Sequence, residues 1–144
     1  MPYREKSAWA SLIAMLVAYG VYFVLIVPRL LAAPEAPLPY LGLLFGCCVG
    51  LVILEIAMQT FVAVTMRDQA NLPMDERERL IALKSDRVAL IVLTTLIASG
   101  WTLYAAAPAL LGSSAALANL LLLTLVLSAA AKHASVIVYF RRGA

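Results

Sequence analysis

Residues 38–66, LPYLGLLFGCCVGLVILEIAMQTFVAVTM, form an apolar stretch whose one charged side chain is that of Glu55. A helix of this length is roughly 44 Å long at about 1.5 Å per residue, and the hydrocarbon core of a bilayer is about 30 Å thick. Residues 8–31, 88–111 and 115–140 are apolar stretches of similar length. The sequence therefore predicts an all-α fold, an integral membrane four-helix bundle with one domain over residues 1–144.

The composition supports a membrane protein over a water-soluble one. Hydrophobic residues make up 64% of the chain and charged residues 13%, which leaves too little polar material to cover a soluble globule. The net charge is +3, and the basic residues cluster at the ends of the predicted spans. Anionic lipid headgroups are the nearest partners for such residues, so we expect the lipid bilayer as a partner and no nucleic acid.

The distribution of basic residues predicts the orientation in the membrane. Of the eleven lysine and arginine residues, only Arg29 lies on the side that the chain reaches after an odd number of crossings. The positive-inside rule then places both termini and the connection at 67–87 in the cytoplasm. The expected location is the bacterial inner (plasma) membrane. The opposite-side links, at 32–37 and 112–114, are too short to form a domain.

The cytoplasmic connection contains the strongest motif, DERERLIALKSDRVA at residues 75–89. Asp75 can cap a helix, and Glu78 follows three positions later, as a capping box requires. The predicted helix either continues straight into the third span and extends beyond the membrane, or breaks near Ser85 and lies on the bilayer surface.

This motif resembles the cytoplasmic DER[DE]-type motif of small bacterial four-span membrane proteins that carry a domain of unknown function. Residues 3–9, YREKSAW, resemble the start of alphaproteobacterial members. The resemblance implies a signalling partner in the cytoplasm, because some members are encoded beside small helix-turn-helix regulators. With Arg79 from the same run, the cytoplasmic motif comprises Asp75, Glu76, Arg77, Glu78, Arg79, Lys84 and Arg87.

Three acidic or basic residues, Glu55, Lys132 and His133, lie deep inside predicted spans. Each costs at least about 2.5 to 3.5 kcal/mol at mid-membrane and needs a partner or a water-filled cavity. Glu55 and Lys132 lie at comparable depths, and each shares a helical stripe with other polar residues. We therefore predict a polar seam between the second and fourth spans. Its members are Glu55, Gln59, Thr124, Ser128, Lys132 and Ser135.

The seam has three interpretations. Glu55 and Lys132 can form a structural ion pair, they can form a proton- or ion-linked site, or Lys132 can extend to the inner surface. His133 points about 100° away from Lys132. It is either a hydrogen-bonded neutral side chain near the inner interface or a proton relay.

A ridge of small residues in the second span includes two successive GxxxG spacings, at Gly42, Gly46 and Gly50. Small residues let helix backbones approach closely in lipid. The ridge is expected either to pack against the first or third span or to form a symmetric dimer, and a homo-oligomer is expected.

Metal and enzyme motifs are missing from the sequence. One histidine and no Cys-x-x-Cys leave too few ligands for a bis-histidine haem or a closed zinc site, so we expect no metal and no cofactor. Phosphate-binding loops and nucleophile elbows are also missing, and we expect no enzymatic activity.

The sequence is consistent with two functions. The first is a non-enzymatic regulatory or interaction protein that presents its charged cytoplasmic helix to a protein partner. The second is a small proton- or ion-coupled transporter or channel that uses Glu55 with Lys132.

Overall fold

The computed structural model describes residues 2–32, 38–108 and 113–142, and they are almost entirely helical. The elements are α1 (Tyr3–Ala32), α2 (Leu38–Thr65), α3 (Arg67–Ala70), α4 (Glu76–Ala106) and α5 (Ser114–Arg142). The four long helices are long and apolar enough to cross a membrane. The all-α architecture of four long helices is therefore confirmed, whereas the predicted opposite-side links lie largely outside the described residues.

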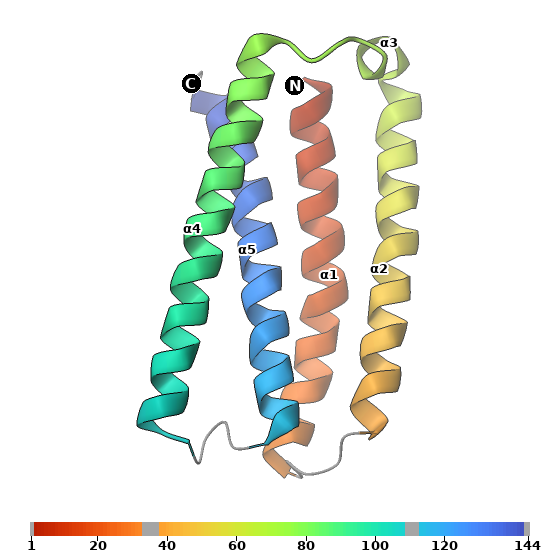
Figure 1. The fold of residues 1–144 in the computed structure, drawn as a ribbon. Coiled ribbons are helices and arrows are strands. Elements are labelled where there is room, and N and C mark those ends of the chain that lie inside the picture. Colours follow the sequence, from red (N-terminus) through yellow and green to blue (C-terminus); the bar gives the residue numbers. More distant parts are fainter. Residues whose placement is uncertain (1, 33–37, 109–112, 143–144) are drawn as a thin grey trace.

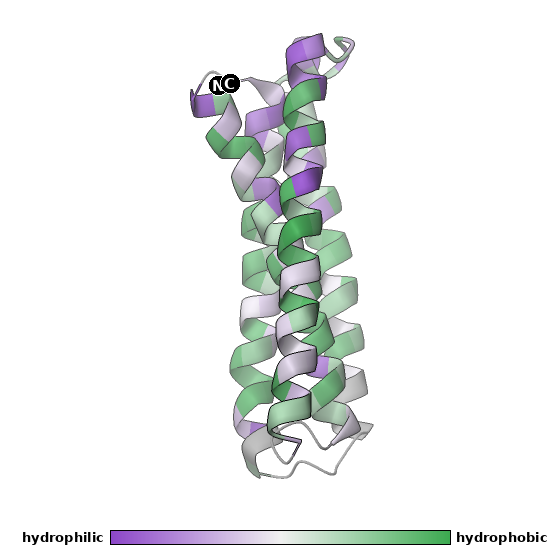
Figure 2. Ribbon diagram, turned by 60° about the vertical axis from the view of Figure 1, so that its left-hand side comes forward, coloured by the Kyte–Doolittle hydropathy of each residue, from purple (hydrophilic) through white to green (hydrophobic). Residues whose placement is uncertain are grey.

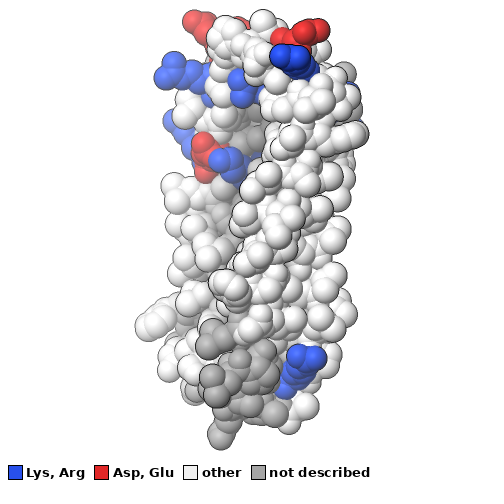
Figure 3. All heavy atoms as spheres, turned by 90° about the vertical axis from the view of Figure 1, so that its right-hand side faces the viewer, with Lys and Arg blue, Asp and Glu red and all other residues white. Residues whose placement is uncertain are grey.

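The long helices are arranged in the order α2, α1, α5, α4. Helix α1 packs against α2 and α5, and α5 packs against α1 and α4. Figure 1 shows both termini and α3 at one end of the bundle, and hydrophilic residues concentrate at this end in Figure 2. The acidic and basic side chains visible in Figure 3 also gather mainly there, and we call it the charged end.

The buried core lies along α1, which packs against both α2 and α5. Small residues, Ala8, Ala10 and Ala14, are buried near its beginning and let the neighbouring helices approach closely. Towards the opposite end of the bundle, Tyr22 and Ile26 are fully buried and pack against residues of α2 and α5. Tyr22 Oη also donates a hydrogen bond to Asn119 Oδ1 of α5 at 2.7 Å.

The helix boundaries agree with the local sequence signals. The predicted capping box forms at Asp75 and Glu78, and α4 then continues without a break at Ser85. Of the two predicted geometries for this segment, the continuous helix is correct. The helix ends at Ala106, before the predicted end at 111, because Pro108 cannot continue a helix and disfavours helical geometry in the residue before it.

Candidate functional site

A cluster of polar side chains joins α1 to α2 about three turns from the charged end. Ser11 Oγ donates a hydrogen bond to Glu55 Oε1 at 2.5 Å, and Gln59 Nε2 donates to the same oxygen at 3.1 Å. Gln59 Nε2 also lies 2.7 Å from Ser11 Oγ, and Gln59 Oε1 accepts from Ser7 Oγ at 2.7 Å. The hydrogen-bond partners described for the Glu55 carboxylate are therefore uncharged hydroxyl and amide groups.

Helical spacing explains how the cluster forms. Ser7 and Ser11 are four residues apart on α1, as Glu55 and Gln59 are on α2, and side chains at this spacing share one face of a helix. The two faces meet at the α1–α2 interface, where Ser11 is 7% exposed. At this interface two neutral side chains, Ser11 and Gln59, bond the Glu55 carboxylate, and Ser7 bonds Gln59.

Lys132 does not pair with Glu55, which corrects the predicted seam. Its Nζ lies 2.7 Å from Asp86 Oδ1 of α4, and both side chains are partly exposed. The physical reason is the helix order: α1 lies between α2 and α5, so the polar stripes of those two helices face different neighbours. The stripe of α2 faces α1, and the stripe of α5 faces α4.

The other α5 residues of the predicted seam agree with this correction. Ser128 Oγ donates across the interface to the Ala89 carbonyl of α4 at 2.8 Å. Thr124 is buried and donates to the carbonyl of Leu121 within α5, while Ser135 donates to the carbonyl of Lys132. Ser128 therefore joins α5 to α4, the other two hydroxyl groups are satisfied within α5, and all three lie apart from the Glu55 cluster.

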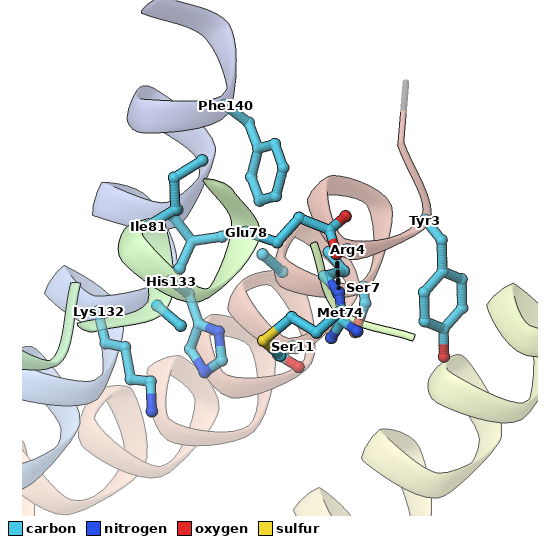
Figure 4. A pocket seen from close by; sticks show the side chains of 13 residues that line it. Tyr3, Arg4, Ser7, Ser11, Met74, Glu78, Ile81, Lys132, His133 and Phe140 are labelled. Carbon is cyan, nitrogen blue, oxygen red and sulfur yellow. Dashed lines mark hydrogen bonds and ion pairs between the residues drawn. The ribbon is translucent and has the colours of Figure 1, made fainter. Parts of the chain in front are cut away.

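A cavity of about 200 Å³ opens among α1, α4 and α5 at the level of this cluster. Figure 4 shows the His133 imidazole directed into the cavity, with Ser11 on α1 facing it. His133 also interacts electrostatically with Glu55. The cavity wall is partly polar and partly apolar. Its main polar residues are Arg4, Ser7, Ser11, Glu78, Lys132 and His133, and its main apolar residues are Ala8, Ile81, Ala82, Val136 and Phe140.

Ion pairs connect the helices at the charged end. Arg4 Nε of α1 lies 2.7 Å from Glu78 Oε2 of α4, so the capping-box glutamate also holds the two helices together. Glu5 of α1 is buried and pairs with Arg141 of α5 at 3.2 Å. Lys84 Nζ of α4 lies 5.8 Å from the ring centroid of Tyr139. Two residues of the predicted cytoplasmic motif, Glu78 and Lys84, thus contact other helices of the same chain.

Three other residues of the motif lie on an exposed face of α4. Glu76, Arg79 and Arg87 are exposed and lie on one stripe of the helix with Leu80 and Leu83. The two leucines are 57% and 54% exposed. We call these five residues the α4 stripe.

The glycine ridge of α2 has no neighbour within the described chain. A Cβ built at Gly42, Gly46 or Gly50 meets no atom within 4 Å. Packing of this ridge against the first or third span, one of the two predictions, is therefore wrong. Close approach occurs instead at Gly100 of α4, where a Cβ would lie 3.2 Å from Leu120 Cδ2 of α5.

Several residues of the site were not predicted from the sequence. The i, i+4 spacing of Ser7 and Ser11 at the charged end of α1 was an available signal, because it matches the spacing of Glu55 and Gln59. Asp86 is also an acid two residues before the third apolar stretch. Gly100 carries no such signal, since its importance depends on which residue of α5 lies opposite.

No group of three potential metal ligands occurs among residues 2–32, 38–108 and 113–142. Comparison with protein-family models, with curated proteins and with solved structures found no match for this chain.

Proposed function

We propose that the chain spans the bacterial inner membrane four times, with its charged end outside the hydrocarbon core. The support is a level shared by polar residues of all four long helices: Ser11, Glu55, Asp86 and Lys132, which we call the polar layer. Ser11 binds Glu55, Lys132 binds Asp86, and Ser11 and Lys132 line one cavity. The part of each long helix between this layer and the end opposite the charged end is roughly 27 to 33 Å long at about 1.5 Å per residue.

That length matches a hydrocarbon core of about 30 Å. The polar layer then lies at the boundary of the hydrocarbon, and approximately 12 to 15 Å of each helix continues past it towards the charged end. Ten of the eleven lysine and arginine residues belong to this end or to the termini beside it. By the positive-inside rule, the charged end and both termini are cytoplasmic.

Within this orientation the protein acts as a non-enzymatic interaction protein, and the α4 stripe is its contact surface for a cytoplasmic protein partner. One observation carries this proposal: Leu80 and Leu83 are more than half exposed on a helix that extends beyond the hydrocarbon, between Glu76 and Arg87. Apolar side chains surrounded by charges of both signs are typical of protein contact surfaces.

The test uses a photo-crosslinking amino acid at position 83 in cells of the source organism. We expect a protein adduct on illumination, and we expect the double charge reversal Glu76→Lys, Arg79→Glu to reduce both this adduct and co-purification of the partner by about tenfold. The two substituted side chains are exposed, so the fold should persist.

A matched control places the crosslinker at Ile91, which is 64% exposed two turns further along α4. In the proposed orientation this position faces lipid and gives no partner adduct. Partner co-purification that is unchanged by the double charge reversal would refute the α4 stripe as the contact surface, provided that thermal unfolding of the variant is unchanged.

We also propose that the protein forms a homo-oligomer through the glycine ridge of α2. Because a side chain at Gly46 meets no atom of the same chain within 4 Å, Gly46→Leu should change the free energy of unfolding of the monomer by less than about 0.5 kcal/mol. The same substitution should disrupt an oligomer, which blue-native electrophoresis or crosslinking in detergent measures. Val49→Leu, at an exposed position on the same helix, is the control. An oligomer that survives Gly46→Leu must use another face.

A further inference from the structure

Glu55 is a carboxylate at the proposed hydrocarbon boundary whose described hydrogen-bond partners are uncharged. The groups bonded to it are Ser11 on α1 and Gln59 one turn away on α2, and His133 on α5 lines the same cavity as Ser11. Lys132, the cation expected to neutralise it, is paired with Asp86 of α4. Hydroxyl and amide groups can bind a carboxylate and a carboxylic acid alike, whereas an ion pair stabilises the charged form alone. This environment therefore permits Glu55 to gain and lose a proton.

The cavity supplies a route for that proton. Ser11 and His133 both line it, and Ser11 Oγ is bonded directly to Glu55 Oε1. Its volume of about 200 Å³ holds roughly six water molecules at about 30 Å³ each. The wall offers hydroxyl, imidazole, ammonium and carboxylate groups as partners for water (Figure 4). The cavity thus connects the aqueous side of the charged end with the hydroxyl that touches Glu55.

We propose that Glu55 is a proton-binding site that exchanges protons with water at the charged end through the cavity and the Ser11 hydroxyl. In the uptake step, a hydronium ion in the cavity gives a proton to Ser11 Oγ, and Ser11 gives its own hydroxyl proton to Glu55 Oε1. The products are water, an unchanged serine and a neutral glutamic acid. This site is independent of the α4 stripe and goes beyond the proposed function.

The experiment follows the C=O stretching band of protonated Glu55 by infrared spectroscopy in lipid nanodiscs. We expect a carboxylic acid band that responds to pH and that is missing from Glu55→Gln. On transfer to D₂O, the band should shift rapidly, because the cavity gives the acid proton access to solvent.

Two variants test the route. Ala82→Phe fills the cavity and should slow the deuterium exchange of this band by about tenfold or more, while Leu90→Phe, at a side chain of α4 that is 60% exposed and does not line the cavity, should leave the exchange rate unchanged. Ser11→Ala removes the relay hydroxyl and should also slow exchange. Circular dichroism verifies that each variant is folded.

Three results would overturn the proposal. The first is that no pH-sensitive carboxylic acid band depends on Glu55. The second is that the band exists but exchanges at the same rate in folded Ala82→Phe as in the unmodified protein. The third is that exchange in Ser11→Ala is as fast as in the unmodified protein, which would exclude the hydroxyl relay.

Discussion

Replacing Tyr22 with alanine is expected to lower the free energy of unfolding by about 3 to 5 kcal/mol, the largest effect of any single substitution considered for this fold. Tyr22 is 1% exposed and packs with Ile26 between α1, α2 and α5. Its removal leaves a cavity where three helices meet, and it also leaves Asn119 without the hydroxyl donor that lies 2.7 Å away. Equilibrium unfolding in mixed detergent micelles measures the change.

The contribution of the hydrogen bond can be separated from that of packing. Tyr22→Phe keeps the ring and should cost only about 1 kcal/mol, the usual value of an interhelical hydrogen bond in a membrane protein. Val24→Ala, at a side chain that is 74% exposed, is the control and should be nearly neutral. A loss in Tyr22→Ala that is no greater than in Tyr22→Phe would mean that the ring contributes little to the packing of these helices.

Replacing Arg141 with glutamine is expected to lower the free energy of unfolding by about 2 to 3 kcal/mol. Glu5 is 5% exposed, and Arg141 Nε binds its carboxylate at 3.2 Å. The guanidinium also lies 5.6 Å from the ring centroid of Trp9. Removing one member of a buried ion pair leaves an uncompensated charge, which costs about 3 to 5 kcal/mol in full burial, and the 60% exposure of Arg141 reduces that value here.

A double-mutant cycle with Glu5→Gln tests this explanation. The double variant should recover part of the stability lost in Arg141→Gln, because no buried charge is left unpaired. Arg142→Gln, at the next residue, has an exposed side chain and should change stability by less than about 0.5 kcal/mol. A double variant that is additively destabilised would show that the two residues act independently.

The sequence was sufficient to predict the helices but not their neighbours. The apolar stretches gave the four long helices, and Asp75 with Glu78 correctly predicted the beginning of α4, because these signals depend only on composition and on spacing within one helix. The polar stripes of α2 and α5 were also identifiable from helical phase. Each stripe nevertheless faces a different helix from the one expected.

This difference has a physical cause. Helical phase says which residues of one helix share a face, but it does not say which helix packs against that face. The depth and charge of Glu55 and Lys132 favour a pair between them, but neither property shows that α1 lies between their helices. The uncharged residues Ser7 and Ser11 were missed for the same reason, since short hydroxyl side chains become important only when an acid lies opposite.

The position of α1 and α5 between the outer helices has a consequence for biosynthesis. The first two long helices, which pack against each other, are synthesised first, whereas α4 packs mainly against α5, which is synthesised last. In the proposed four-span topology α4 therefore lacks its principal neighbour until the end of the chain emerges. The addition of α5 then completes both remaining interfaces, so the final helix made is the one that joins the two halves of the protein.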